Sequence, residues 1–210
     1  IGEVVNSEAE QTGLRVSFIP NYRVSLAERI IPAADVSEQI STAGMEASGT
    51  GNMKFAMNGA LTIGTLDGAN IEIRDLVGAE NFFLFGQTTE EVAKTKASGY
   101  RGRQIYETNP AVKEVLDLLS SGFFSPEDRT LFRPLVDSLL NEDPYLVLAD
   151  FDGYVKAQED VARKYNDPKA WWRSAIINVA RMGFFSSDRT IREYAKDIWG
   201  IESVPAAADE

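Results

Sequence analysis

The chain has 210 residues, which is enough for one large or two small domains with a sizeable core. Hydrophobic residues make up 44% of it and charged residues 25%, as is typical of globular proteins. The net charge of −11 argues against binding to nucleic acid or to an anionic membrane surface. Cysteine and histidine are absent, which excludes disulfides, thiolate metal sites and imidazole catalysis within this sequence. No apolar window reaches the length of a transmembrane helix.

The first predicted elements are a strand and a short helix. Residues 14–19 alternate and are rich in β-forming side chains, which predicts a strand that Pro20 ends. Residues 25–31 predict a helix with Ser25 as its N-cap and Pro32 as its stop. Tyr22 and Arg23 fall on the loop between them, at the strand end where open α/β sheets bind ligands. An arginine there is either a surface charge or a fork for phosphate oxygens.

The most informative stretch is the glycine-rich turn Gly49-Thr50-Gly51, which precedes a run of helix formers from Asn52. Exposed N–H groups in such a turn, together with the positive end of the helix dipole, favour an anion such as phosphate. Lys54 follows about one helical turn later, so its amine can reach back over the turn. This pattern suits a phosphorylated aldehyde cofactor.

Three other interpretations of this turn differ in the residues that they require. A nucleotide P-loop requires Gly-Lys-Ser/Thr, but Met53 precedes Lys54 and Phe55 follows it. A dinucleotide-binding fingerprint requires a third glycine where Lys54 stands. An ordinary glycine-rich turn beside a surface lysine remains open on local pattern alone.

The middle of the chain predicts further sheet strands. Residues 61–66 form a β-rich run followed by a turn or helix start at 67–70, and residues 81–85 form an apolar run typical of a buried parallel strand. Thr89 is a candidate cap for the next helix. This alternation of strands and helices predicts a doubly wound α/β sheet.

After about Gly99 the pattern becomes mainly helical. Helices are predicted at residues 110–119, 131–140, 146–165, 170–182 and 190–199. Ser125, followed by proline and two acidic residues, is a helix-start signal. The similar Gly-Phe-Phe-Ser stretches at 122–125 and 183–186 predict similar helix-to-helix connections. Trp171, Trp172 and Trp199 fit packing inside the core or between domains better than sugar platforms. A frayed tail is predicted at 204–210.

Residues 46–59 resemble the pyridoxal-phosphate attachment segment of the α-glucan phosphorylases, the family of the glycogen, starch and maltodextrin phosphorylases. The similarity extends over most of the chain and matches the C-terminal part of that family. Its other stretches are residues 21–35, 37–44, 59–70, 80–86, 119–125 and 185–190. A resemblance of this length is highly specific.

The resemblance implies a fold and a domain organisation. It implies α/β architecture, with part of the C-terminal Rossmann-like domain of a retaining glycosyltransferase of the two-domain GT-B type, followed by a helical region. Residues 1–99 would be the doubly wound region that binds pyridoxal phosphate, and 100–210 the mainly helical remainder of the same domain. Because the chain lacks an initiator methionine and the family is far longer, we expect a C-terminal fragment.

The resemblance also implies roles for individual residues. Lys54 would hold pyridoxal 5'-phosphate as a Schiff base, with the cofactor bound by Gly49, Thr50, Gly51, Tyr22 and Arg23. Catalytic roles would belong to Lys54, Glu46 and Arg23, although Glu46 is not expected to be the catalytic acid. Substrate binding would involve Glu46, Ala47, Ser48 and Gly49, because a carboxylate's acceptors suit sugar hydroxyls. Glu38, eight residues before Glu46, is expected to be structural.

The implied reaction is cleavage of α-1,4-glucans by orthophosphate to give glucose 1-phosphate with retained configuration. The full-length enzyme is expected to be a cytoplasmic homodimer that needs no metal. The upstream part of the same enzyme would supply the other wall of the cleft, so this chain alone is expected to be inactive. Two other classes stay open from the residues: a nucleotide-sugar-dependent retaining glycosyltransferase and a non-catalytic sugar- or phosphate-binding module.

Overall fold

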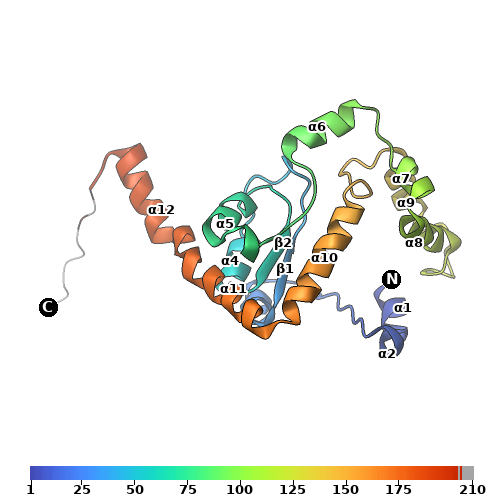
Figure 1. Ribbon diagram of the computed structural model, residues 1–210, viewed down its shortest axis with the longest axis horizontal. Coiled ribbons are helices and arrows are strands. Elements are labelled where there is room, and N and C mark those ends of the chain that lie inside the picture. Colours follow the sequence, from blue (N-terminus) through green and yellow to red (C-terminus); the bar gives the residue numbers. More distant parts are fainter. Residues whose placement is uncertain (203, 205–210) are drawn as a thin grey trace.

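A computed structural model of the chain describes residues 1–202 and 204 (Figure 1). The predicted frayed tail therefore lies, apart from Val204, outside the described residues. The elements of the first half are, in chain order, α1 (Gly2–Ser7), α2 (Ala9–Thr12), α3 (Val24–Ile30), the 3-10 turn η1 (Ile31–Ala33), β1 (Val36–Gln39), α4 (Gly51–Met57), β2 (Leu61–Gly64), α5 (Asn70–Val77), the 3-10 turn η2 (Ala79–Asn81) and β3 (Phe83–Leu84).

The second half is helical, as the sequence predicts. Its elements are α6 (Thr89–Ala97), α7 (Gly102–Thr108), α8 (Pro110–Ser121), α9 (Arg133–Asn141), α10 (Phe151–Tyr165), α11 (Pro168–Arg181), the 3-10 turn η3 (Met182–Phe185), α12 (Ser187–Glu193) and the π-helical turn η4 (Tyr194–Trp199). None of the helices within the described residues is both long enough and apolar enough to cross a membrane.

Within the described residues the sheet has three parallel strands in the order β1-β2-β3. Val36 is paired with Leu61 at the amino end of β1, and Ile63 is paired with Phe83 in β3. Every residue of the central strand β2 is buried, as expected for a parallel strand covered on both faces. The predicted strands at 61–66 and 81–85 are thus confirmed, although both are shorter than predicted. Because the strands are parallel, their carboxyl ends lie at the same edge of the sheet.

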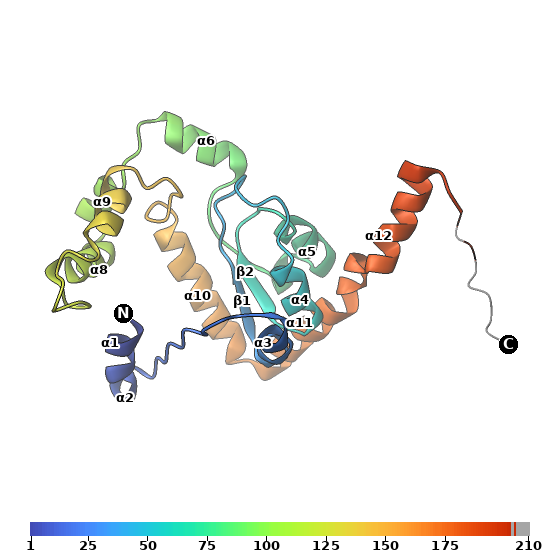
Figure 2. The ribbon, with the colours of Figure 1, turned by 180° about the vertical axis from the view of Figure 1, so that it is seen from behind.

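Helices cover both faces of this sheet (Figures 1 and 2). On one face Leu61 and Ile63 pack with residues of α10 and α11, including the buried Trp171. A second apolar cluster joins α4, α5 and η3 around Ala56 and Ile73. The predicted α/β class with helices on both faces of a parallel sheet is therefore confirmed. Because α10 and α11 come from the second half of the chain, that half supplies one of the two covering layers.

The helices α7, α8 and α9 build a separate apolar cluster beside the start of α10. Val112, Leu116 and Leu119 of α8 pack there against Val136 of α9 and Leu148. Asn109 caps α8, because its side-chain oxygen accepts hydrogen bonds from the N–H groups of the first turn.

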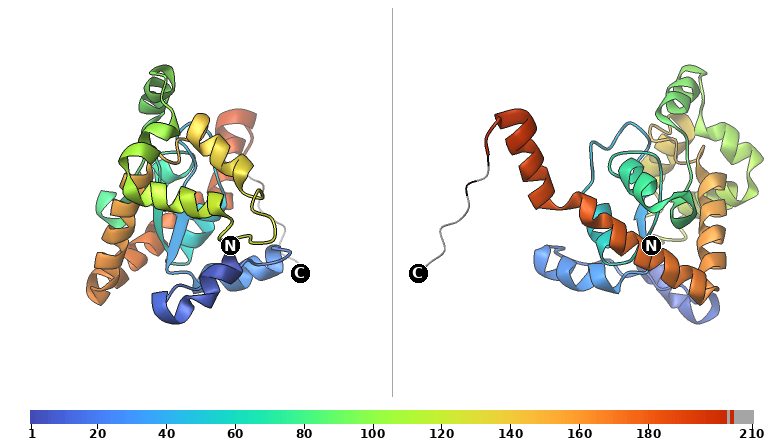
Figure 3. Two further views of the ribbon diagram at one scale, coloured as in Figure 1. Left: turned by 90° about the vertical axis from the view of Figure 1, so that its right-hand side faces the viewer. Right: turned by 60° about the vertical axis from the view of Figure 1, so that its left-hand side comes forward.

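The carboxyl-terminal helix α12 projects away from the sheet, as the right-hand view of Figure 3 shows. The turn before it contains the edge-to-face pair Phe184 and Phe185, whose ring centroids lie 5.3 Å apart. The connection after α8 holds a matching pair, Phe123 and Phe124, at 5.1 Å. The predicted similarity of these two connections is confirmed only for the aromatic pair. Gly122 ends α8 with a φ of +83°, whereas Gly183 lies inside the 3-10 turn η3. Trp171 is a core residue as predicted, whereas Trp172 and Trp199 are exposed.

The predicted strand at residues 14–19 is wrong. These residues pair with no strand that the structure describes, and their apolar side chains remain outside the core, with Phe18 94% exposed. Alternation alone does not make a strand, because its backbone N–H and C=O groups also need a partner strand. The Asn6 side chain accepts a hydrogen bond from the N–H of Val16 and donates one to its carbonyl oxygen. These two bonds satisfy at Val16 the backbone groups that a neighbouring strand would otherwise pair.

Three predicted N-caps are also wrong, and the helix predicted at 146–165 begins only at Phe151. Ser25 lies inside α3, whose N-cap is Arg23 without a side-chain hydrogen bond. Thr88 rather than Thr89 caps α6, in a capping box with Glu91. Ser125 begins no helix: Asp128 instead accepts hydrogen bonds from Thr130, and α9 starts at Arg133. The Asp128–Thr130 turn competes locally with helix formation.

Candidate functional site

The candidate site is the loop that leaves β1 at the carboxyl edge of the sheet and leads into α4 (Figure 1). Its glycine-rich turn has the predicted form. Gly49 has a φ of +77°, and a Cβ there would lie 3.3 Å from the side-chain amide of Asn52. The N–H groups of Gly49, Thr50 and Gly51 form no hydrogen bond with any residue in the described part of the chain. These donors are therefore available to an external acceptor.

Asp67 fixes the first part of this loop. Its buried carboxylate accepts hydrogen bonds from the N–H groups of Gly44, Met45 and Glu46 at 2.9, 3.2 and 2.7 Å. Such charge-assisted bonds are stronger than bonds between neutral groups. The loop is thereby held against the turn that follows β2, and the position of Glu46 is set by a residue on a different loop.

Two further contacts hold the glycine-rich turn itself. The N–H of Ala69 donates to the carbonyl oxygen of Ser48 at 2.6 Å. Gly68 lies directly against the same carbonyl group, so any Cβ at position 68 would collide with it. The close approach of these two backbones requires glycine at that position.

A buried pair of amides joins the start of α4 to the start of α5. Asn52 donates to the side-chain oxygen of Asn70 at 2.9 Å, and both side chains are buried. Asn70 in turn donates to the carbonyl oxygens of Gln39 and Thr65, the residues at the ends of β1 and β2. The amino end of α4 is thus connected by hydrogen bonds to both neighbouring strands.

Lys54 lies one turn into α4 and is exposed. Its backbone N–H donates to the carbonyl oxygen of Thr50 at 3.4 Å, which places the two residues one above the other on the helix surface. Side chains on a helix lean toward its amino end, so the Lys54 amine can reach back toward the glycine-rich turn. Within the described residues Lys54 has no ion-pair partner.

The predicted substrate-binding residues surround the same turn. Glu46, Ala47 and Ser48 are exposed, and a carboxylate oxygen of Glu46 accepts from the N–H of Ser48 at 3.3 Å. The structure therefore brings Glu46, the turn and Lys54 together in one continuous loop and helix. Their outward-facing groups are an acid, N–H donors and an amine.

Tyr22 and Arg23 are placed differently. Both are exposed at the start of α3, and neither side chain forms a hydrogen bond or ion pair with residues 46–54 in the part of the chain that the structure describes. The η1 turn that follows α3 packs against α4. These two residues thus precede a neighbouring helix and form no hydrogen bond or ion pair with the turn.

Glu38 lies on β1 and is directed toward α10. Its carboxylate accepts hydrogen bonds from the Tyr154 hydroxyl at 2.9 and 3.0 Å and from the Gln158 amide at 2.6 Å. These contacts attach α10 to the sheet, so its role here is structural, as the sequence predicts.

Sequence reasoning did not identify Asp67, Asn70 and Asn52 as site residues. Asp67 and Asn70 follow β2 at the carboxyl edge of the sheet, the position at which α/β proteins place functional side chains. A short stretch of aspartate, glycine and asparagine directly after a strand is the signal that could have identified two of them.

Comparisons with known proteins show the family of this chain. A family model for carbohydrate phosphorylase matches residues 1–201. A glycogen phosphorylase of Synechocystis sp. is 63% identical over 205 residues, which are 97% of this chain and 24% of the relative. The muscle form of glycogen phosphorylase from Homo sapiens is 55% identical over 203 residues, with 96% of this chain and 24% of the relative covered. The chain thus spans about a quarter of the length of these relatives. It belongs to the carbohydrate phosphorylase family.

Proposed function

We propose that this chain is the cofactor-binding portion of an α-1,4-glucan phosphorylase, which cleaves its glucan with orthophosphate and releases glucose 1-phosphate with retained configuration. The family assignment and the glycogen phosphorylase names of its relatives support this proposal. The observation that carries it is the set of unpaired N–H groups at Gly49, Thr50 and Gly51, with Lys54 one helical turn further along α4.

The residues present fit pyridoxal 5'-phosphate. The consecutive N–H donors of the glycine-rich turn would hold its phosphate group, and the exposed Lys54 amine would bind its aldehyde carbon. Because Gly49 and Gly51 lack side chains, an anion could approach the backbone closely. Tyr22 and Arg23 would complete the cofactor site from α3, with the guanidinium group acting as a fork for phosphate oxygens.

The remaining residues of the loop would bind and orient the glucosyl unit. The Glu46 carboxylate offers paired acceptors to sugar hydroxyls, and Ala47, Ser48 and Gly49 present their backbone beside it. Asp67 would keep this wall in place through its three N–H contacts. When bound, the cofactor supplies a phosphate group that supports proton transfer at the substrate phosphate. The protein's contribution is then mainly positioning and charge stabilisation.

The 210-residue chain alone is proposed to be catalytically inactive. It spans 24% of the length of its relatives, and Glu46, Ser48 and Lys54 are exposed in it. An exposed site cannot exclude water or strengthen its electrostatic interactions as a closed one does. Release of glucose 1-phosphate from glycogen and orthophosphate by the purified chain would contradict this proposal.

Further parts of the proposal rest on the family resemblance. We infer that the full-length enzyme is a cytoplasmic homodimer of GT-B architecture, with residues 1–99 and 100–210 as two regions of its C-terminal domain. The upstream part of the enzyme would form the opposite wall of the cleft.

The proposal predicts a specific label on Lys54. The chain, and the full-length enzyme that contains it, would be incubated with pyridoxal phosphate, reduced with borohydride and analysed by peptide mass mapping. We expect a phosphopyridoxyl group on the Lys54 peptide, because Lys54 lies one helical turn after the unpaired N–H groups. Lys54→Ala should lose the label, and Lys96→Ala, which removes an exposed lysine of α6, should keep it.

Two results would contradict the assignment. One is a label spread evenly over surface lysines in both proteins; the other is a full-length enzyme that carries no label at all. A nucleotide-sugar glycosyltransferase or a non-catalytic sugar-binding module would give the second result. Neither alternative is supported by the relatives, which are phosphorylases by name.

A further inference from the structure

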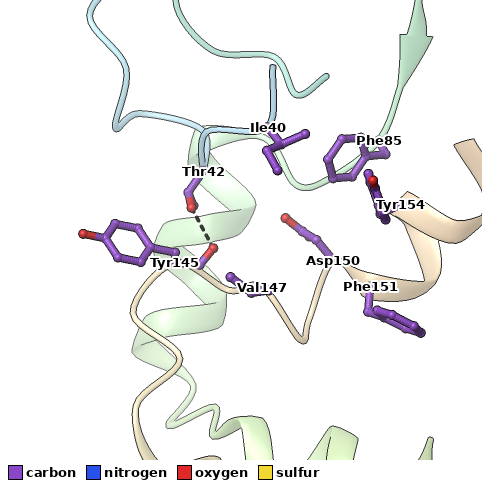
Figure 4. A pocket seen from close by; sticks show the side chains of 8 residues that line it. All are labelled: Ile40, Thr42, Phe85, Tyr145, Val147, Asp150, Phe151 and Tyr154. Atoms are coloured by element: carbon purple, nitrogen blue, oxygen red, sulfur yellow. Dashed lines mark hydrogen bonds between the residues drawn. The ribbon is translucent and has the colours of Figure 1, made fainter. Parts of the chain in front are cut away.

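A pocket opens at the carboxyl edge of the sheet, on the face covered by α10. It has a volume of about 310 Å³, within the range of small-molecule sites. Its walls come from separate parts of the chain: Ile40 follows β1, Phe85 follows β3, and Asp150 and Tyr154 belong to the start of α10. Figure 4 shows these side chains around a common space. None of them belongs to the cofactor and substrate site proposed above.

The walls of this pocket are fixed by contacts of their own. The rings of Phe85 and Tyr154 meet edge to face with centroids 5.3 Å apart. The Tyr154 hydroxyl is held by Glu38, and the Thr42 hydroxyl donates to the carbonyl oxygen of Tyr145 at 2.6 Å, as the dashed line in Figure 4 shows. A pocket whose walls are already ordered binds a ligand with a smaller loss of conformational entropy.

Asp150 is the one acidic group that lines this otherwise apolar and aromatic pocket among the described residues. Among the described residues only Gln87 donates hydrogen bonds to its carboxylate, with the side-chain amide at 3.3 Å, and the structure gives it no ion pair with any described lysine or arginine. Burial raises the pKa of this carboxyl group, and the nearby carboxylates of Asp143 and Glu91 add to the rise. A half-buried carboxylate with this little compensation favours a positively charged partner.

We propose that this pocket binds a small organic cation with an aromatic body, whose ammonium group pairs with Asp150 while the body packs against Phe85 and Tyr154. Electron-rich ring faces attract cations, so the aromatic wall and the carboxylate favour the same ligand charge. Orthophosphate and glucose 1-phosphate, the substrate and product of the proposed reaction, carry the opposite charge and are disfavoured here. The pocket is therefore a site separate from the phosphorylase reaction.

The proposal is tested with three indoles of equal ring system and different charge. Tryptamine carries an ammonium group, 3-methylindole is neutral and indole-3-acetate is an anion at pH 7. Each is titrated into the ¹⁵N-labelled chain while the amide resonances of Thr42, Gly86 and Asp150 are followed. We expect tryptamine to bind about tenfold more tightly than 3-methylindole, as for a paired and ring-stacked cation, and indole-3-acetate to bind more weakly than both.

Two variants distinguish the effect of the Asp150 charge on binding from a general effect of losing a carboxylate. Asp150→Asn retains an oxygen acceptor for Gln87 and should reduce the preference for tryptamine over 3-methylindole to less than about twofold, without loss of 3-methylindole binding. Asp137→Asn removes an exposed carboxylate of α9 outside the pocket and should leave the preference unchanged. Equal affinities of the three indoles for the unmodified chain, resonance shifts remote from the pocket, or a preference that survives Asp150→Asn would each overturn the proposal.

Discussion

Replacement of Asp67 by alanine is expected to lower the free energy of unfolding by about 3–5 kcal/mol, because three charge-assisted hydrogen bonds are lost together. The N–H groups of Gly44, Met45 and Glu46 would lose their common acceptor. Total stabilities of domains are about 5–15 kcal/mol, so this is a large fraction. Urea unfolding of the variant and the unmodified chain measures the difference.

The conservative variant Asp67→Asn should recover only part of this loss. One carboxylate oxygen accepts from Gly44 and the other from Met45 and Glu46, so an amide NH₂ in either position would face an N–H donor. Asp75→Asn, an exposed carboxylate on α5, is the matched control and should change stability by less than about 0.5 kcal/mol. An Asp67→Asn variant as stable as the unmodified chain would show that the carboxylate does not hold the loop.

Replacement of Asp143 by alanine is expected to have an effect of similar size, about 3–5 kcal/mol, in the loop before α10. Its fully buried carboxylate accepts hydrogen bonds from the Tyr100 hydroxyl and from the N–H groups of Val147 and Leu148. Asp143 also has a φ of +40°, a conformation that aspartate and asparagine tolerate better than alanine. Loss of this residue would release the loop before α10. Thermal or urea unfolding of the variant and the unmodified chain measures the change in the free energy of unfolding.

Tyr100→Phe tests the hydrogen bond from Tyr100 to Asp143 separately from the other two. It removes one of the three contacts and should cost about 1–2 kcal/mol at pH 7. Burial, followed by the hydrogen bond to Asp143, raises the pKa of Tyr100 well above its usual value. The contribution of its protonated hydroxyl is therefore complete below about pH 10, where the unfolded tyrosine ionises, and is lost as the pH rises above it. A stability gap between the two proteins that widens above pH 10 would contradict this account.

Sequence patterns predicted the central layers of the fold because those elements are specified locally. The apolar runs of β2 and β3 and the helical spacing of α8, α10 and α11 each carry their own signal. The edge strand β1 was missed because Val-Ser-Glu-Gln has no strong β pattern: its strand state is set by pairing with Leu61 to Gly64. Residues 14–19 show the reverse case, a strand pattern without a partner.

Only the local part of the site could be predicted from the sequence. Gly49 to Gly51 and Lys54 are close in sequence, so their arrangement follows from helix geometry. The contacts that hold them are long-range: Asp67 bonds residues 21 to 23 positions earlier, and Asn52 meets Asn70 across 18 positions. Such long-range contacts cannot be predicted from the spacing of residues in one sequence. The residues meet because β1 and β2 pair in parallel, which brings the loops after the two strands together.

The central claim is that the glycine-rich turn and Lys54 form one cofactor site, and a crystal structure of the chain after incubation with pyridoxal phosphate tests it most directly. The account predicts electron density continuous with the Lys54 amine. It also predicts phosphate oxygens about 2.7–3.2 Å from the backbone nitrogens of Gly49, Thr50 and Gly51. Cofactor attached to a different lysine, or a phosphate group that contacts none of these nitrogens, would contradict it.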